Sequence, residues 1–313
     1  MYARIESAGY YLPSKALGND AFSYLDTSDE WIQQRTGIIK RHIAADDENA
    51  TDLACEAAKD IMATTQIKSE QIDAIIIATA SQHQAMPSIA CKVANHINAG
   101  DCFALDINAA CSGFVYALQL AQASIGKQWK YVLVIGSDTM SKMLNWEDRA
   151  TCVLFGDAAA GVLLKASEEP GILDVACQAS GQGHSYLYTN GDKWQNKACT
   201  LLMQGNEVYR RALAKQVDIT KALLEKNAIA KESIHWCIPH QANKRLIIKL
   251  MQQLNLDQDR AIITVDKHAN TSAASIPLAL AHAIRSAKIQ RGQRLLMQAF
   301  GAGFTWGAAI VDY

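Results

Sequence analysis

No apolar run in the 313-residue chain approaches the roughly 20 residues that a membrane-spanning helix needs, so the sequence predicts no membrane partner. The opening segment MYARIESAGYYLP has neither the basic nor the apolar region of a signal peptide, and we expect a cytoplasmic protein. Lysine and arginine (30 residues) balance aspartate and glutamate (31 residues), which argues against a nucleic-acid partner. The 50% hydrophobic content predicts a large buried core, in two lobes.

Patterns typical of metal and cofactor sites are also missing. None of the eight cysteines forms a CxxC pair, and most lie in apolar runs, so neither a zinc site nor a disulfide framework is predicted. No GxGxxG motif follows a first strand, which argues against a nicotinamide site. We therefore expect no metal and no cofactor, and we interpret seven cysteines as small core residues. Cys111 is the exception because of its surroundings.

The two halves of the chain follow one plan. A helical stretch at 51–65 leads into the apolar segment AIIIATA at 74–80, and a second one at 207–228 leads into WCIPH at 236–240. Such apolar strands alternating with helices are typical of parallel sheets that are covered on both faces.

Three further matches follow in the same order. FALDINAACSG matches IITVDKHANTSAA, which places Cys111 over Thr271; YVLVIGSDTM matches LLMQAFGAG, and AAAGVLLK matches WGAAIVDY. Four matches in one order indicate a duplication, with an N-terminal half at 1–166 and a C-terminal half at 167–313. Two βαβαβαββ halves that share a core predict a five-layer α/β/α/β/α sandwich, with a ligand site where strands of both halves end.

Three reactive side chains are predicted at that place. Cys111, His240 and Asn270 each follow a buried apolar run and precede a helix. A soft nucleophile, an imidazole and a carboxamide together suit carbon–carbon bond formation on an acyl thioester. At a helix N-terminus, the thiol of Cys111 is expected to have a lowered pKa that favours the thiolate.

His240 and Asn270 each have a structural alternative. A lone histidine is more often structural than catalytic, and His268 is a nearby competitor. Asparagine is an ordinary helix cap, but Thr271 or Ser272 could cap this helix, leaving the amide of Asn270 to donate a hydrogen bond to a thioester enolate.

The glycine-rich turn FGAGFTWG at 300–307 is predicted close to the same point. Its backbone N–H groups, Ala302 among them, could form an oxyanion hole with the N–H of Cys111. Glycine-rich turns are common, so this feature is weak on its own.

Seven segments together resemble the β-ketoacyl-acyl carrier protein synthase III family: TSDEWIQQRTGI, DINAACSGF, GSD with DRATCVLFGDAA, GNEVY, PHQAN, HANTSAAS and FGAGFTWG. The resemblance runs from the first strand to the C-terminus. It implies a thiolase-like fold, a homodimer, and initiation of type II fatty acid synthesis. The implied reaction acylates Cys111 from acyl-CoA, typically acetyl-CoA, and condenses that acyl group with malonyl-acyl carrier protein. His240 and Asn270 would stabilise the enolate formed by loss of CO2.

The resemblance also implies binding roles. Trp31 and Arg149 would sandwich the CoA adenine, Arg35 would contact a CoA phosphate, and Asn206 and Asn243 would line the pantetheine channel. Without the resemblance, Trp31 could be an ordinary aromatic and Arg149 a solvated charge.

A basic group on two helices near the cleft would suit an acidic carrier protein. Its members are Arg210, Arg211, Lys244, Arg245 and Lys249. A solvated helix face is the alternative. Because Gln252 and Gln253 stand where family members often carry further basic residues, the group is expected to be weaker here.

Two departures from the family pattern bear on the site. Ala302 replaces the middle glycine of FGGGF and would be strained if that position needs a positive φ. Met86 stands where an aromatic of the partner subunit often ends the acyl pocket. Because methionine is pliable, we expect primers longer than acetyl to be accepted.

Two other functions remain open. A specialised synthase of a polyketide or signalling-molecule pathway would use the same three side chains, and its choice between malonyl-acyl carrier protein and malonyl-CoA would distinguish it. A non-catalytic acyl-CoA-binding or carrier-protein-docking module would keep Trp31 and the basic group but would not need Cys111.

Overall fold

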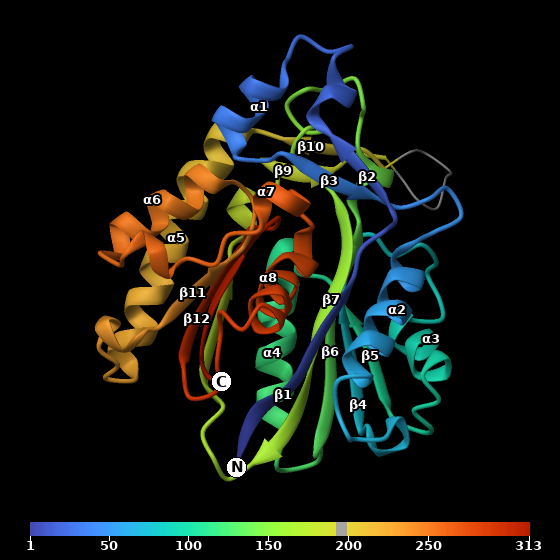
Figure 1. Ribbon diagram of the computed structural model, residues 1–313, viewed down its shortest axis with the longest axis vertical. Helices are drawn as coiled ribbons and strands as arrows, with labels where there is room; N and C mark the ends of the chain where they lie inside the picture. Colours follow the sequence, from blue (N-terminus) through green and yellow to red (C-terminus); the bar gives the residue numbers. More distant parts are fainter. Residues whose placement is uncertain (192–198) are drawn as a thin grey trace.

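Two β-sheets lie face to face in the computed structural model, which describes residues 1–191 and 199–313 (Figure 1). The first sheet has the order β1-β7-β6-β4-β5. Its strands are β1 (Tyr2–Tyr11), β7 (Asp157–Ser167), β6 (Tyr131–Thr139), β4 (Ala74–Ala78) and β5 (Phe103–Ile107). The second sheet has the order β8-β13-β12-β11. Its strands are β8 (Ile172–Ala179), β13 (Thr305–Asp312), β12 (Arg294–Gly301) and β11 (Trp236–Pro239).

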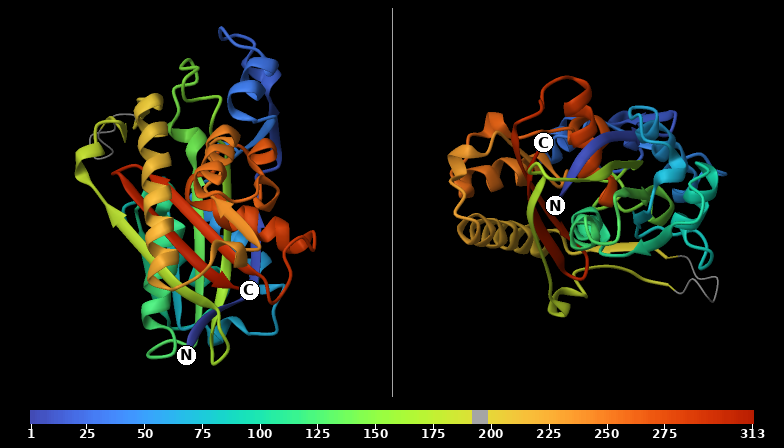
Figure 2. Two further views of the ribbon diagram at one scale, coloured as in Figure 1. Left: turned by 90° about the vertical axis from the view of Figure 1, so that its left-hand side faces the viewer. Right: turned by 90° about the horizontal axis from the view of Figure 1, so that it is seen from below.

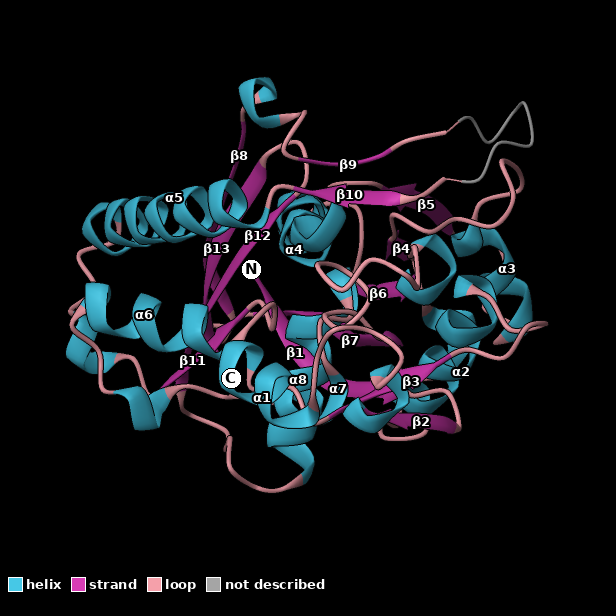
Figure 3. Cartoon of the chain, turned by 90° about the horizontal axis from the view of Figure 1, so that it is seen from above, coloured by secondary structure: helices cyan, strands magenta, loops and turns pink. Residues whose placement is uncertain are grey.

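Helices form the other three layers (Figure 3). The two central helices, α4 (Gly113–Ser124) and α8 (Ser275–Arg285), lie between the sheets and are apolar on most sides. The outer helices are α2 (Ala50–Met62) and α3 (Ile89–His96) on the first sheet, and α5 (Gly205–Lys226) and α6 (Lys244–Leu254) on the second. The predicted α/β/α/β/α order is therefore confirmed.

Each half supplies one sheet, and the strand orders correspond. The strands β1, β7, β6 and β4 of the first sheet correspond in order to β8, β13, β12 and β11 of the second. The pairs β7–β6 and β13–β12 are both antiparallel. The pairs β6–β4 and β12–β11 are both parallel. We propose that 1–166 and 167–313 are the duplicated halves, because this boundary falls at the last residue of β7, Ser167, and ahead of β8, which begins at Ile172.

Among the described residues of the second half, no strand corresponds to β5. A strand was expected in IITVD from its match to FALDI, but only an isolated bridge between Cys237 and Ala261 is present there. The side chain of Gln241 takes over the hydrogen bonds: its Oε1 accepts from Thr264 N at 2.8 Å, and its Nε2 donates to Ile262 O at 3.1 Å. The chain then enters α7 (Val265–His268), so no fifth strand forms.

Short elements cover one end of the sandwich, opposite the two chain termini (Figures 1 and 2). The motif matches did not predict them as separate elements. They are the hairpin of β2 (Lys15–Gly18) and β3 (Lys40–Ile43), the helix α1 (Asp29–Thr36), and the pair β9 (Leu187–Thr189) and β10 (Leu201–Met203). Helix α1 begins where Ser28 accepts the N–H of Trp31, and it ends at Gly37, whose φ of 76° suits glycine.

Candidate active site

A strained turn presents Cys111 between β5 and α4. Asn108 Oδ1 accepts the N–H of Ala110 at 3.1 Å, and Ala110 has a φ of 47°. The β12–β13 hairpin packs directly against this turn, because a side chain at Gly301 would come within 2.8 Å of Cys111 N. Thr305 Oγ1 donates to Ala109 O at 2.8 Å and fixes the hairpin in place. The N–H of Cys111 donates to no described backbone carbonyl.

The same turn recurs in the second half, where it carries Asn270. Asn270 Oδ1 accepts the N–H of Ser272 at 2.9 Å, and Ser272 has a φ of 52°. Thr271 was one of two alternative caps, but its side chain makes no cap bond, and the oxygen of Asn270 accepts the N–H itself. Its Nδ2 has no partner in the described ranges, so the amide remains a donor for the cavity.

The two turns also correct the alignment of the halves. Asn108 corresponds to Asn270, and Cys111 corresponds to Ala273, not to Thr271 as the sequence match indicated. The sequence alignment had started from the apolar segments that precede the two turns, FALDI and IITVD. Because α7 replaces the strand expected in IITVD, the second half needs two more residues to reach its central helix.

His240 follows β11 directly, as predicted. Its backbone N–H donates to Gln298 O at 2.7 Å, and its ring Nδ1 lies 2.6 Å from Ser275 Oγ. Burial lowers the pKa of His240 to about 4, so the imidazole is neutral at physiological pH.

Burial has the opposite effect on Cys111. It raises the pKa of the thiol to about 12; a hydrogen bond with the side chain of Ser272 lowers it, and the charge of Asp138 raises it further. The expected lowering of the Cys111 pKa was therefore wrong. The thiol lies in a 3-10 turn ahead of α4, and no cation is among the groups that shift its pKa.

Asp138 at the end of β6 is a buried anchor that the sequence analysis did not single out. One of its oxygens accepts from Ala80 N and Ser81 Oγ, both at 2.8 Å, and the other accepts from Ala273 N at 3.2 Å. Desolvation raises the pKa of this carboxyl, while the bonds from these groups and from Ser272 lower it. The sequence feature that could have identified Asp138 is its place in the GSD motif at 136–138.

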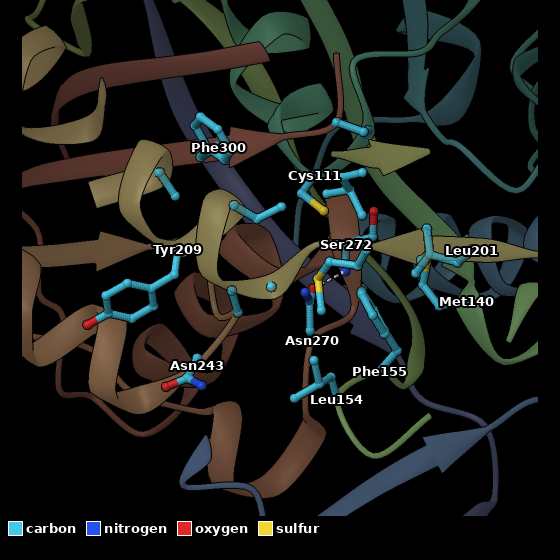
Figure 4. A pocket seen from close by; sticks show the side chains of 18 of the residues that line it. Cys111, Met140, Leu154, Phe155, Leu201, Tyr209, Asn243, Asn270, Ser272 and Phe300 are labelled. Carbon is cyan, nitrogen blue, oxygen red and sulfur yellow. Dashed lines mark hydrogen bonds between the residues drawn. The ribbon is translucent and has the colours of Figure 1, made fainter. Parts of the chain in front are cut away.

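All three predicted reactive residues line one cavity of about 480 Å³. In Figure 4 the sulfur of Cys111 and the amide of Asn270 point into the same space, with Phe300 on one side and Leu154 on the other. Much of the remaining wall is apolar: Met140, Met143, Val153, Phe155, Leu187, Leu201, Met203, Ala212 and Leu246.

The five residues with implied CoA roles line the same cavity. Two guanidinium groups lie close to the ring of Trp31, with Arg149 Cζ 5.1 Å and Arg35 Cζ 5.6 Å from its centroid. Arg149 also bonds to Asp26. Asn243 caps α6 by accepting from Arg245 N at 2.8 Å, and it also donates to Arg35 O. Asn206 lies at the start of α5 and is exposed.

The remaining predicted site residues lie outside this cavity or on its edge. Met86 is 80% exposed and does not line it. The basic residues Arg210, Lys244, Arg245 and Lys249 are exposed on α5 and α6, which pack against each other. Arg210 bonds to Glu207 at 2.8 Å, as does Arg211 at 3.3 Å, so part of the positive charge is neutralised.

Ala302 lines the cavity at the tip of the β12–β13 hairpin. It is not among the residues with positive φ, so the expected strain is absent. The glycine requirements lie on either side: Gly301 has no room for a side chain, and Gly303 has a φ of 132°. Alanine is therefore compatible with the turn.

No helix within 1–191 and 199–313 is long and apolar enough to cross a membrane. In the same ranges, no group of three or more histidine, cysteine, aspartate or glutamate side chains could hold a metal ion.

Residues 105–181 and 224–313 match the family models for 3-oxoacyl-[acyl-carrier-protein] synthase III and for its C-terminal part. A β-ketoacyl-[acyl-carrier-protein] synthase III of Xylella fastidiosa (strain 9a5c) is 46% identical over 320 residues, which cover 100% of this chain and 99% of the relative. The 3-oxoacyl-[acyl-carrier-protein] synthase III of Aquifex aeolicus VF5 is 40% identical in sequence, with a TM-score of 0.94 over 99% of this chain and 100% of that one.

The priming β-ketosynthase of the R1128 polyketide pathway is 28% identical, with a TM-score of 0.95 over 99% of this chain and 96% of that one. These likenesses confirm the predicted thiolase-like fold.

Proposed function

This chain belongs to the β-ketoacyl-[acyl-carrier-protein] synthase III family, and on that premise we propose that it condenses an acyl-CoA primer with malonyl-acyl carrier protein. The primer is acetyl-CoA, and the products are 3-oxoacyl-acyl carrier protein, CoA and CO2. The observation that carries the proposal is the convergence of Cys111, His240 and Asn270 on one cavity whose wall also includes Trp31. CoA thioesters are the substrates, no cofactor takes part, and the reaction is cytoplasmic.

The first step transfers the acyl group to Cys111. The sulfur attacks the thioester carbonyl, and the oxyanion that forms is bound by the N–H groups of Cys111 and Ala302. The bond from the carbonyl carbon to the CoA sulfur then breaks, and the proton of the Cys111 thiol ends on CoA. The raised pKa of Cys111 keeps its thiol protonated at physiological pH in the free protein.

The second step uses the other two residues. Malonyl-acyl carrier protein loses CO2, and the electron pair of the broken carbon–carbon bond moves onto the thioester oxygen as an enolate. His240 and the amide of Asn270 donate hydrogen bonds to that oxygen. The enolate carbon attacks the acyl-Cys111 carbonyl, the carbon–sulfur bond breaks, and the released sulfur takes up a proton.

Substrates enter across the covering elements. Trp31 and Arg149 hold the adenine of CoA, Arg35 a phosphate, and Asn206 and Asn243 the pantetheine arm. Because Arg149 already lies over Trp31, it must move aside to admit the adenine between them.

The carrier protein docks on the exposed basic residues of α5 and α6, namely Arg210, Lys244, Arg245 and Lys249. Lys249→Glu should raise the KM for malonyl-acyl carrier protein, most strongly at low salt. The KM for acetyl-CoA should not change, and a parallel rise in both would exclude this docking surface.

The functional unit is a homodimer joined through β5. Within 1–191 and 199–313 this strand is the edge of the first sheet and pairs on one side only, and two of its apolar side chains are exposed, Phe103 (47%) and Leu105 (37%). Leu105→Arg should give monomers in sedimentation, whereas Tyr24→Arg, on the covering elements, should leave dimers. Dimers of Leu105→Arg would overturn this assignment.

In the dimer, Met86 of each subunit would end the acyl pocket of its partner. Its pliable side chain would admit longer primers. If acylation with butyryl-CoA and hexanoyl-CoA is negligible beside acetyl-CoA, this role for Met86 fails.

The R1128 likeness favours one second candidate, a priming synthase of a polyketide pathway. The two functions can be distinguished by the malonyl thioester that the enzyme condenses with the primer, either malonyl-acyl carrier protein or malonyl-CoA. The purified protein should condense acetyl-CoA with malonyl-acyl carrier protein of fatty acid synthesis and show little turnover with malonyl-CoA. Turnover with malonyl-CoA alone would refute the primary proposal.

A further inference from the structure

Ser275, the first residue of α8, contacts the ring of His240. Ser275 Oγ lies 2.6 Å from Nδ1 of the imidazole, and both residues are buried, with 1% and 6% of their surfaces exposed. The other ring nitrogen, Nε2, has no hydrogen-bond partner in the described part of the chain. Because His240 lines the cavity, Nε2 is the nitrogen left for a substrate.

The hydrogens around Ser275 can be assigned by elimination. Its oxygen accepts the backbone N–H of Gln241 at 3.3 Å, a contact that uses a lone pair. The hydroxyl has one proton to donate, and Nδ1 of His240 is the one acceptor that it contacts within 1–191 and 199–313. If Nδ1 carried a proton, the hydroxyl proton of Ser275 would be buried without an acceptor, which is unfavourable.

We propose that Ser275 is a positioning residue that holds His240 in the tautomer with its proton on Nε2. The inference deepens the proposed function and rests on it. In this tautomer Nε2–H and the Asn270 amide are two donors facing one cavity, which suits an enolate oxygen. The other tautomer would turn a lone pair of Nε2 toward the developing negative charge and repel it.

The assignment separates the two chemical steps. A protonated Nε2 of neutral His240 cannot accept the thiol proton of Cys111, so acylation of Cys111 does not depend on Ser275. Decarboxylation needs the Nε2–H donor and does depend on it. A residue that only supported the fold would affect both steps together.

The first test reads the tautomer directly in the wild-type protein without substrate. Histidine is labelled with ¹⁵N, and two-bond ¹H–¹⁵N spectra are compared with those of His240→Gln to assign the ring. We expect Nδ1 of His240 to show the shift of a nitrogen without hydrogen, and Nε2 that of an N–H. The reverse pattern overturns the proposal, whatever the protein catalyses.

The second test compares Ser275→Ala with Ser275→Thr, which retains a hydroxyl. In Ser275→Ala, malonyl-acyl carrier protein decarboxylation should fall by about 10- to 100-fold, while the rate of Cys111 acylation by acetyl-CoA stays within about twofold. Ser275→Thr should restore most of the decarboxylation rate. Equal losses of both steps in Ser275→Ala, or no loss in either, overturn the proposal.

These results are distinguishable from a failure of the proposed function. If the wild-type protein does not condense acetyl-CoA with malonyl-acyl carrier protein, the proposed function fails. The ring-nitrogen shifts of the free protein still decide where the proton of His240 lies.

Discussion

Asp138 accepts the backbone N–H of Ala273 at 3.2 Å and so joins the end of β6 in the first half to the turn that carries Asn270. Ala273 is the counterpart of Cys111, whose own N–H donates to no described backbone carbonyl. One half uses this N–H to bind a carboxylate inside the protein. In the other half, we propose that this N–H binds the oxyanion of a substrate.

Asp138→Asn tests this bond. The amide oxygen can still accept from Ser81, but the NH2 group would face the N–H of Ala273, which is left unsatisfied at a cost of about 1–3 kcal/mol. Urea denaturation should show that loss, and malonyl decarboxylation should fall about tenfold as the Asn270 turn shifts. Ser81→Ala is the matched control: it removes a bond from the same carboxylate, yet decarboxylation should remain within about twofold. Equal decarboxylation in the two variants would show that the bond does not position Asn270.

Asn270→Asp should separate acylation from condensation. The aspartate still accepts the N–H of Ser272, so the turn is kept, but the donor to the enolate becomes an acceptor. Decarboxylation should fall by about 100-fold or more, measured as CO2 release from malonyl-acyl carrier protein. Asn108→Asp makes the same change at the equivalent turn and should cost less than about tenfold. If decarboxylation falls further in Asn108→Asp than in Asn270→Asp, the enolate is bound by the Asn108 turn and the role proposed for Asn270 is wrong.

His268 should make the fold sensitive to acid. It is buried and stacks on His282, with 4.8 Å between the ring centroids. Burial, and then the charges of His282, His42, Lys267 and Lys40, lower its pKa to about 3. An unfolded histidine titrates near 6.5, so the unfolded chain binds the extra proton. This contribution to stability is complete above about pH 6.5 and is lost as the pH falls toward about 3.

Urea denaturation between pH 7 and pH 5 measures the effect. The wild-type protein should lose up to about 1.4 kcal/mol per pH unit from this one site. His268→Gln should reduce the slope, with the remainder coming from His240 and His282, whose pKa values burial also lowers. His83→Gln, which alters an exposed histidine, should leave the slope unchanged. The same slope in all three proteins would rule out this source of acid sensitivity.

Trp31→Ala should weaken binding of the nucleotide end of CoA alone. Loss of the stacking surface should raise the KM for acetyl-CoA about tenfold. Acetyl-pantetheine, which has no adenine, provides the control, and its KM should be unchanged. If both values rise together, Trp31 shapes the cavity and does not contact the adenine.

Much of the candidate site could be predicted from short sequence motifs. Cys111, His240 and Asn270 were predicted because each follows an apolar run of the sequence and precedes a predicted helix, and parallel strands end at one edge of a sheet. The five implied CoA residues also line the same cavity. These features depend on short segments and on the layer order, which the sequence pattern indicates well.

Tertiary contacts decided the features that sequence could not give. The segment after Ala261 forms no strand because the side chain of Gln241 bonds Ile262 and Thr264, which lie 21 and 23 residues further along the chain. The raised pKa of Cys111 follows from its burial, which its position before a helix did not indicate. Ser275 and Asp138 act through bonds to distant segments, and a small polar residue in TSAAS or GSD has no pattern that reveals such a bond.

Acylation at Cys111 tests the central claim most directly. The protein is incubated with acetyl-CoA carrying a radiolabelled acetyl group, digested, and the labelled peptide is identified by mass spectrometry. We predict one acetyl group per chain, on the peptide that contains Cys111, released as labelled 3-oxoacyl-acyl carrier protein when malonyl-acyl carrier protein is added. No label in the wild-type protein, or the same label in Cys111→Ser, would contradict the mechanism.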